Sequence, residues 1–199
     1  MKNNMISNVH VNSIFPHELS EWCNNNGTKM IHITTDCVFS GNSGFYTEAS
    51  SHDCVDEYGK SKSLGEPSDC MVLRTSIIGE EIHSFSSLIS WVKSQNGKTI
   101  SGYTNHMWNG MTTTQYAKCC IEIIERDLYE SGLFHIHSND VTKYDLVKMI
   151  AEEFKLKLTI NPKVVNNSCN RTLRSLKDLN AKLNIDKIEN QLKEIGKNT

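Results

Sequence analysis

The run MIHITTD (residues 30–36) and the run DEYGKSKSLGE (residues 56–66) together decide the fold that this sequence predicts. Residues 30–35 are short, β-branched and largely apolar, as expected for a strand that is covered on both faces. Residues 56–66 have helical spacing, and Asp56 stands where it can cap the first turn. The glycine-containing loop between the two runs is long for a connection, which indicates a functional segment.

The rest of the chain continues this alternation of strands and helices. Further strands are expected at 70–79, 98–101, 133–138 and 156–160, and helices at 16–26, 84–95, 113–127 and 142–155, with two short helices within 172–195. The helix at 142–155 opens with Thr142 and has Asp145 three residues later, as in a capping box. Alternation of this kind produces parallel pairing, so we predict an α/β protein in which 30–35, 70–75 and 133–137 are parallel strands.

Composition excludes several classes of partner. The 199 residues carry 21 Lys and Arg against 23 Asp and Glu, a formal net charge of −2, so no basic footprint for nucleic acid or anionic lipid is expected. No apolar run approaches the roughly 20 residues that span a bilayer, and the first residues lack the apolar core of a signal peptide. We therefore expect a cytoplasmic protein. Its seven cysteines lack any zinc-type spacing, which favours free thiols and no metal site.

The spacing Tyr58-x-x-x-Lys62 carries the most chemical information. Residues four apart share one face of a helix, so the phenol and the ammonium can act together, although this pattern also occurs on ordinary solvated helix faces. Thr35 and Asp36 follow a predicted parallel strand, at the edge of the sheet where open α/β proteins bind ligands. Thr35 and Tyr58 could then share one substrate oxygen, the tyrosine donating its proton while hydride reaches the carbon. If Thr35 is only a strand-end cap, this reading fails.

Four motifs in a fixed order resemble the extended short-chain dehydrogenase/reductases, and within them the dTDP-4-dehydrorhamnose reductase (RmlD-like) group. They span about residues 12–175 and are HITTDCVFSG with FYTE, DEYGKSKSLGE, VLRTSIIGEE and GYTNHMWNGMTT. The resemblance implies a catalytic hydroxyl at Thr35 and a proton donor at Tyr58. It implies that Lys62 lowers the pKa of Tyr58 and binds the nicotinamide ribose, and that Thr75 and Ser76 line the nicotinamide side of the pocket.

The resemblance also implies residues that contact a sugar nucleotide. The polar loop from Asn105 to Asn109, which contains Trp108, is similar to the segment that closes over that ligand, and an aromatic ring among amides suits a sugar or base edged by hydroxyls. An exposed loop with one buried tryptophan is the alternative. Arg171 and Arg174 resemble a late arginine segment that can meet the nucleotide phosphates.

The sequence departs from the family at its start. None of the 11 glycines forms G-x-x-G-x-x-G or G-x-G-x-x-G, and the family's opening strand, glycine turn and helix receive the cofactor pyrophosphate. We therefore expect weak binding of NAD or NADP, with the choice between them open. Residues 1–12 are expected to be the tail of a strand. The remaining β-α units could come from a complementary polypeptide or the chain could be a truncated product, and a homo-oligomer is also possible.

Two functions from different classes follow. The first is NAD(P)H-dependent reduction of a nucleotide-linked 4-keto-6-deoxy sugar, impaired in the isolated chain. The second is a non-catalytic sugar-nucleotide-binding or regulatory subunit, resembling the reductase-like subunit of methionine adenosyltransferase. In both cases we predict an incomplete Rossmann-like doubly wound parallel sheet. Its partial core is residues 1–77 and 113–138, and a small substrate-binding part is 78–112 and 139–199.

Overall fold

A three-stranded parallel sheet lies at the centre of the larger part of the molecule. The structure is a computed structural model that describes residues 5–80 and 87–197. Strands β1 (Ile31–Thr35), β2 (Met71–Thr75) and β7 (Gly132–His135) lie in the order β1-β2-β7, and both pairs are parallel. The predicted parallel arrangement of these three segments is confirmed.

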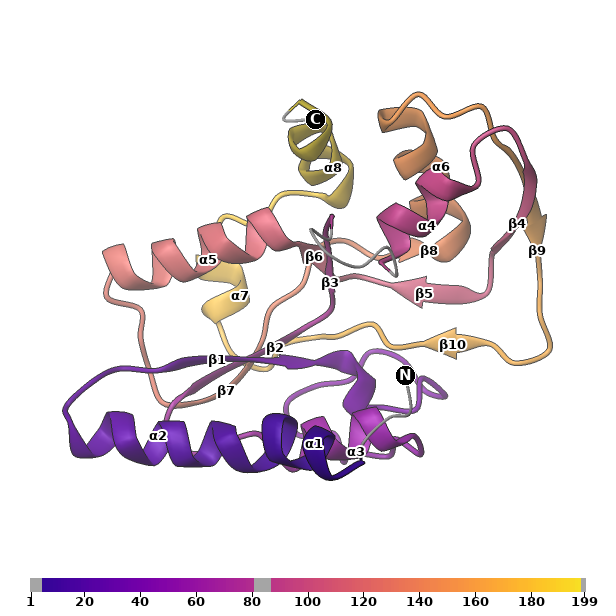
Figure 1. Cartoon of the computed structure of the whole chain (residues 1–199). Helices are drawn as coiled ribbons and strands as arrows, with labels where there is room; N and C mark the ends of the chain where they lie inside the picture. The colour runs from indigo at the N-terminus through magenta and orange to yellow at the C-terminus, as the bar shows by residue number, and fades with distance from the viewer. Residues whose placement is uncertain (1–4, 81–86, 198–199) are drawn as a thin grey trace.

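Helices cover both faces of this sheet, as in a doubly wound fold (Figure 1). Helices α2 (Phe15–Asn25) and α3 (Glu57–Ser63) lie on one face, while α5 (Thr113–Glu125) and the short α7 (Leu179–Lys182) lie on the other. Alternate residues of β2 supply both cores: Val72 packs with residues of α2, whereas Met71 and Leu73 pack with residues of α5 and α7. β2 is therefore buried along its whole length, as expected for a strand covered on both faces.

The first residues form helix, where we expected the tail of a strand. Met5–Val9 is α-helix α1, and His10–Ile14 is a π-helical turn, η1, that leads into α2. Packing against α3 favours this conformation, because the Ser13 hydroxyl donates to the Ser61 carbonyl at 2.7 Å. A Cβ on Gly65 would stand 1.7 Å from the Asn12 carbonyl oxygen, so glycine permits this close approach. Tertiary contact with α3 thus overrides the strand-like pattern.

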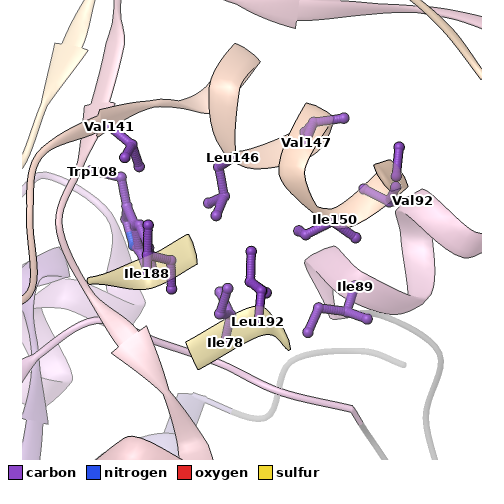
Figure 2. Packing of buried hydrophobic residues seen from close by; sticks show 11 residues of the cluster. Ile78, Ile89, Val92, Trp108, Val141, Leu146, Val147, Ile150, Ile188 and Leu192 are labelled. Carbon is purple, nitrogen blue, oxygen red and sulfur yellow. The ribbon is translucent and has the colours of Figure 1, made fainter. Parts of the chain in front are cut away.

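The smaller part of the molecule is built from short strands and three helices. Its strands are β3 (Ile77–Ile78) with β6 (Met111–Thr112), β4 (Thr99–Tyr103) with β9 (Thr159–Lys163), and β5 (His106–Trp108) between β10 (Cys169–Asn170) and β8 (Val141–Thr142). All these pairs are parallel except β5 with β8. Helices α4 (Leu88–Ser94), α6 (Lys143–Glu153) and α8 (Ile188–Lys197) enclose a separate core, and Figure 2 shows Trp108 in it beside Val141 and Ile188.

Several predicted boundaries differ from the structure. The predicted strand 70–79 breaks at Ser76, where the chain leaves the main sheet and β3 pairs with β6 instead. The strand predicted at 156–160 begins at Thr159, and of the helix predicted at 84–95 residues 84–86 lie outside the described part. The 3-10 turn η2 (Asp36–Val38) directly follows β1. The two-part division stays a prediction, and Leu179 and Leu183 from the proposed second part pack in the core on the main sheet.

Candidate active site

Five of the residues predicted to act together line one cavity. It has a volume of about 340 Å³ and is lined in part by Thr35, Tyr58, Lys62, Thr75 and Ser76. Thr35 and Thr75 are register partners at the ends of β1 and β2, so the parallel pairing itself places both at the carboxyl edge of the sheet. The geometry therefore assembles a candidate site from two strand ends and one helix.

Helix α3 carries Tyr58 and Lys62 on the face that borders this cavity. Asp56 is its N-cap, and the Asp56 carboxylate accepts a hydrogen bond from the Gly59 N–H at 2.8 Å. A Cβ on Gly59 would stand 2.3 Å from the carbonyl oxygen of Cys37. Glycine at this position therefore lets the helix approach the backbone that follows β1, which brings Tyr58 to Thr35.

Tyr58 is half exposed and hydrogen-bonds to the Thr35 side chain. Burial raises the pKa of Tyr58, the nearby Cys37 raises it further, and the bond from Thr35 lowers it. The lowering of the Tyr58 pKa by Lys62 stays a prediction, and the net direction in this structure is a rise whose largest cause is burial. Lys62 donates to the Ile33 carbonyl on β1 at 3.4 Å, and burial lowers its own pKa. This hydrogen bond thus holds the Lys62 side chain against β1.

Asp36 connects the predicted residues, and our sequence analysis did not assign it a role. Its buried carboxyl receives hydrogen bonds from the hydroxyls of Thr35, at 3.3 Å, and Ser76. The Ser76 oxygen in turn accepts the indole N–H of Trp108 at 2.8 Å. Burial raises the pKa of Asp36, while the positive charges of Arg171 and Lys143 oppose that rise. Its place directly after Thr35 in the chain was a usable signal for this role.

A buried cluster of polar side chains lies at the carboxyl ends of β1 and β2. Arg74, fully buried on β2, donates to both oxygens of Glu66, at 3.1 and 2.5 Å, and Glu66 accepts from the Thr34 hydroxyl at 2.9 Å. Arg74 also contacts Nε2 of His135 at 2.8 Å and Nε2 of His52 at 2.6 Å. A guanidinium can only donate, so both imidazoles accept at Nε2 and are neutral in this arrangement.

Burial and the neighbouring Arg74 lower the pKa of His52, and they lower that of His135 to about 4. Neither histidine was assigned a role from the sequence.

The residues predicted to bind the sugar nucleotide divide into two pairs. Trp108 is buried and anchored to Ser76, and Arg171 donates to the Cys37 sulfur at 3.4 Å, so both border the candidate site. Asn105 instead bonds the backbone of Val165: its Nδ2 donates to the Val165 carbonyl at 2.7 Å, and its Oδ1 accepts from the Val165 N–H at 3.2 Å. Arg174 forms an ion pair with Asp140. Asn105 and Arg174 are therefore committed to structural contacts.

Three further findings concern the described part of the chain as a whole. Within residues 5–80 and 87–197, no set of three or more His, Cys, Asp or Glu side chains is arranged to hold a metal ion. No helix in these ranges is long and apolar enough to cross a membrane. All seven cysteines are free.

Curated relatives of this chain include a reductase and a regulatory subunit. The probable low-salt glycan biosynthesis reductase of Haloferax volcanii is 30% identical over 155 residues, which cover 71% of this chain and 51% of the relative. The methionine adenosyltransferase 2 subunit beta of Danio rerio is 28% identical over 144 residues, which cover 65% of this chain and 45% of the relative. The chain thus spans about half the length of these relatives.

Solved structures agree with the fold. The dTDP-4-dehydrorhamnose reductase of Bacillus anthracis, crystallised with NADP, has a TM-score of 0.75 at 19% identity, and the match covers 94% of this chain and 72% of that one. Residues 3–195 match the family model described as the RmlD substrate binding domain, which is nearly the whole sequence. The sequence motifs, the parallel sheet and these matches agree, and the chain belongs to the RmlD substrate-binding domain family.

Proposed function

We propose that this chain supplies the proton-donating and substrate-binding side of an NAD(P)H-dependent reductase of a nucleotide-linked 4-keto-6-deoxy sugar. The observation that carries the proposal is the single cavity that Thr35, Tyr58 and Lys62 line at the carboxyl edge of the sheet. The reductase named among the relatives and the NADP-bound neighbour of the same fold support it.

The proposed reaction reduces a ketone to an alcohol. The nicotinamide, when bound, supplies the hydride that the carbonyl carbon receives. The Tyr58 hydroxyl, half exposed at the cavity, donates a proton to the carbonyl oxygen. The Thr35 hydroxyl donates to Asp36 and accepts from the Cys37 N–H at 3.1 Å, so Thr35 is held in place beside Tyr58 and would orient the tyrosine. Hydride and proton together complete the alcohol.

The residues present fit one end of the dinucleotide. Lys62, Thr75 and Ser76 line the same cavity as Tyr58 and would hold the nicotinamide and its ribose. Among the described residues, none of the three main-sheet strands is followed by a short G-x-x-G-x-x-G turn that leads directly into a helix, the arrangement whose backbone N–H groups bind a pyrophosphate. A few exposed hydrogen bonds of about 0.5–1.5 kcal/mol each do not offset the cost of immobilising a dinucleotide. We therefore expect NAD(P)H to bind no more tightly than millimolar.

Replacement of Tyr58 tests the proposal. Turnover of a dTDP-linked 4-keto-6-deoxy sugar would be followed by NADPH oxidation, with the upstream β-α units of a related reductase added as a separate polypeptide. Tyr58→Phe should abolish turnover and leave sugar-nucleotide binding intact, because only the acid group is removed. Tyr129→Phe, outside the cavity, is the matched control. Equal turnover by Tyr58→Phe and the wild type would refute the mechanism.

A regulatory role is the second candidate. The similarity to the beta subunit of a methionine adenosyltransferase favours it, as does the sequence's lack of the glycine turn. A regulatory subunit should co-purify with a stoichiometric partner and should retain that association in the Tyr58→Phe variant. A reductase should instead turn over the sugar nucleotide once the upstream β-α units are supplied and lose that turnover in the same variant.

A further inference from the structure

Two further cavities adjoin the candidate active site. The catalytic cavity shares Ser76 and Ile77 with a second cavity of about 450 Å³, which Trp108 also lines. That second cavity shares Leu88 and Lys143 with a third, of about 550 Å³, between α4, α6 and the β4–β9 pair. The three cavities are thus adjacent, each sharing wall residues with the next, and we call this row of three cavities the trench. We call the third cavity the lysine groove.

The lysine groove carries positive charge and aromatic surface. Lys143 and Lys163 line it, and no carboxylate is among the described residues of its wall. Trp91 and Tyr103, each about 40% exposed, also line it, and Tyr103 lies directly opposite Lys163 in the β4–β9 register. This combination suits a ligand that is anionic at one point and has a flat ring at another.

Lys143 stands where the groove meets the second cavity, and it is a cation without a close partner. Its ammonium lies 5.0 Å from the centre of the Trp108 ring, and the described residues offer it no hydrogen bond or ion pair. Burial lowers the pKa of Lys143 and the nearby Asp36 raises it, but Asp36 is itself engaged by Thr35 and Ser76. On the far side, the Nε of Arg171 is buried with no hydrogen-bond partner. Glu80 also lines the second cavity, but its carboxylate is paired with Lys93, so Lys143 has no ion pair among the described residues at this junction.

We propose that Lys143 and Lys163 bind the diphosphate of a nucleoside diphosphate sugar, and that Trp91 and Tyr103 contact its base. The sugar would then extend past Trp108 into the cavity of Tyr58, so the trench sets the orientation of the substrate. This inference rests on the proposed function for the sugar end and adds the residues that hold the nucleotide end. A diphosphate provides the two or more charge-assisted hydrogen bonds that these ammonium groups lack.

Calorimetric titration of the full chain with dTDP tests the assignment without any cofactor. Lys143→Met and Lys163→Met should each weaken dTDP binding at least tenfold. Lys148→Met is the matched control, because Lys148 lies on the same helix α6 but its contact is an exposed ion pair with Glu152 outside the groove. Lys163 is exposed, so its replacement keeps the test valid should Lys143→Met fail to fold.

Thymidine separates phosphate binding from general damage. Its affinity should be the same in the wild type and both groove variants, since it carries no phosphate. Absence of dTDP binding by the wild type, wild-type dTDP affinity in both groove variants, or an equal loss of thymidine affinity would overturn the assignment. The Tyr58→Phe variant should bind dTDP normally. Normal groove behaviour with no reductase activity would refute the proposed reaction alone, and reductase activity with unaltered dTDP affinity in the lysine variants would refute this assignment alone.

Discussion

The catalytic cavity and the lysine groove are assembled in different ways. The catalytic cavity takes its side chains from one strand–loop–helix segment and the next strand end, so a short stretch of sequence holds nearly all of them. The lysine groove takes Trp91 from α4, Tyr103 from β4, Lys143 from α6 and Lys163 from β9. Local spacing therefore reveals the first site, whereas only tertiary contact reveals the second.

The largest expected effect separates chemistry from binding. Tyr58→Phe should lower the rate constant for reduction by about 10²- to 10⁴-fold, the range for loss of a general acid, with unchanged affinity for dTDP. Lys143→Met should do the reverse, raising KM with little change in kcat. Steady-state kinetics of the two variants, measured with the upstream units present, check this. A fall in kcat from the lysine variant as large as that from the tyrosine variant would erase the distinction between the two regions.

Arg74 is expected to stabilise the buried cluster next to the catalytic cavity. Arg74→Met should lower the free energy of unfolding by about 3–5 kcal/mol, because it leaves the carboxylate of Glu66 without its buried partner. Urea denaturation followed by circular dichroism measures this. Lys148→Met, which breaks an exposed ion pair, should change the value by less than about 1 kcal/mol. Equal stability of the two variants would show that the cluster beneath the strand ends is dispensable.

Acid should weaken the same cluster. The pKa of His135 is about 4 in the folded chain, below its ordinary value of 6.5, because of burial and the charge of Arg74. As pH falls below 6.5 the unfolded chain takes up a proton that the folded chain refuses, so stability is lost between pH 6.5 and 4. The shift corresponds to about 3 kcal/mol. His135→Gln keeps an acceptor for Arg74 and should show a shallower loss in urea titrations across this range. If His135→Gln and the wild type lost stability equally over this pH range, His135 would not be the neutral group responsible for the loss.

The smallest expected effect is the loss of stability when either of two helix caps is replaced. Thr142 caps α6, accepting from the Asp145 N–H at 3.0 Å, and Thr112 caps α5, accepting from the Gln115 N–H at 3.2 Å. Replacing either with Ala should cost about 1 kcal/mol of unfolding free energy. Only Thr142→Ala should also weaken dTDP binding, by a few-fold, because Lys143 is the first residue of α6. If calorimetry gives the same dTDP affinity for both variants, the start of α6 does not position Lys143 for dTDP binding.

Much of the fold could be predicted because strand and helix patterns are local. The three parallel strands, the Asp56 cap and the Thr142 start were all visible in residue spacing, and the cavity of Tyr58 follows from them. The helical start at Met5–Ile14 was not, since contacts with Ser61 and Gly65 decide it. The net direction of the Tyr58 pKa could not be predicted for a related reason: burial is its largest cause, and burial, like the position of Lys62 against Ile33, depends on packing that no spacing specifies.

We expect this chain to bind the two nucleotides of the proposed reaction with different affinities. The lysine groove should hold the sugar nucleotide, whereas the sequence contains no glycine turn for the pyrophosphate of the dinucleotide. The most direct test is one calorimetric experiment that titrates the 199-residue chain with NADPH and, as the control for a folded site, with dTDP. We predict a saturable dTDP signal and no NADPH binding tighter than millimolar. Micromolar binding of NADPH by the chain alone would contradict the account.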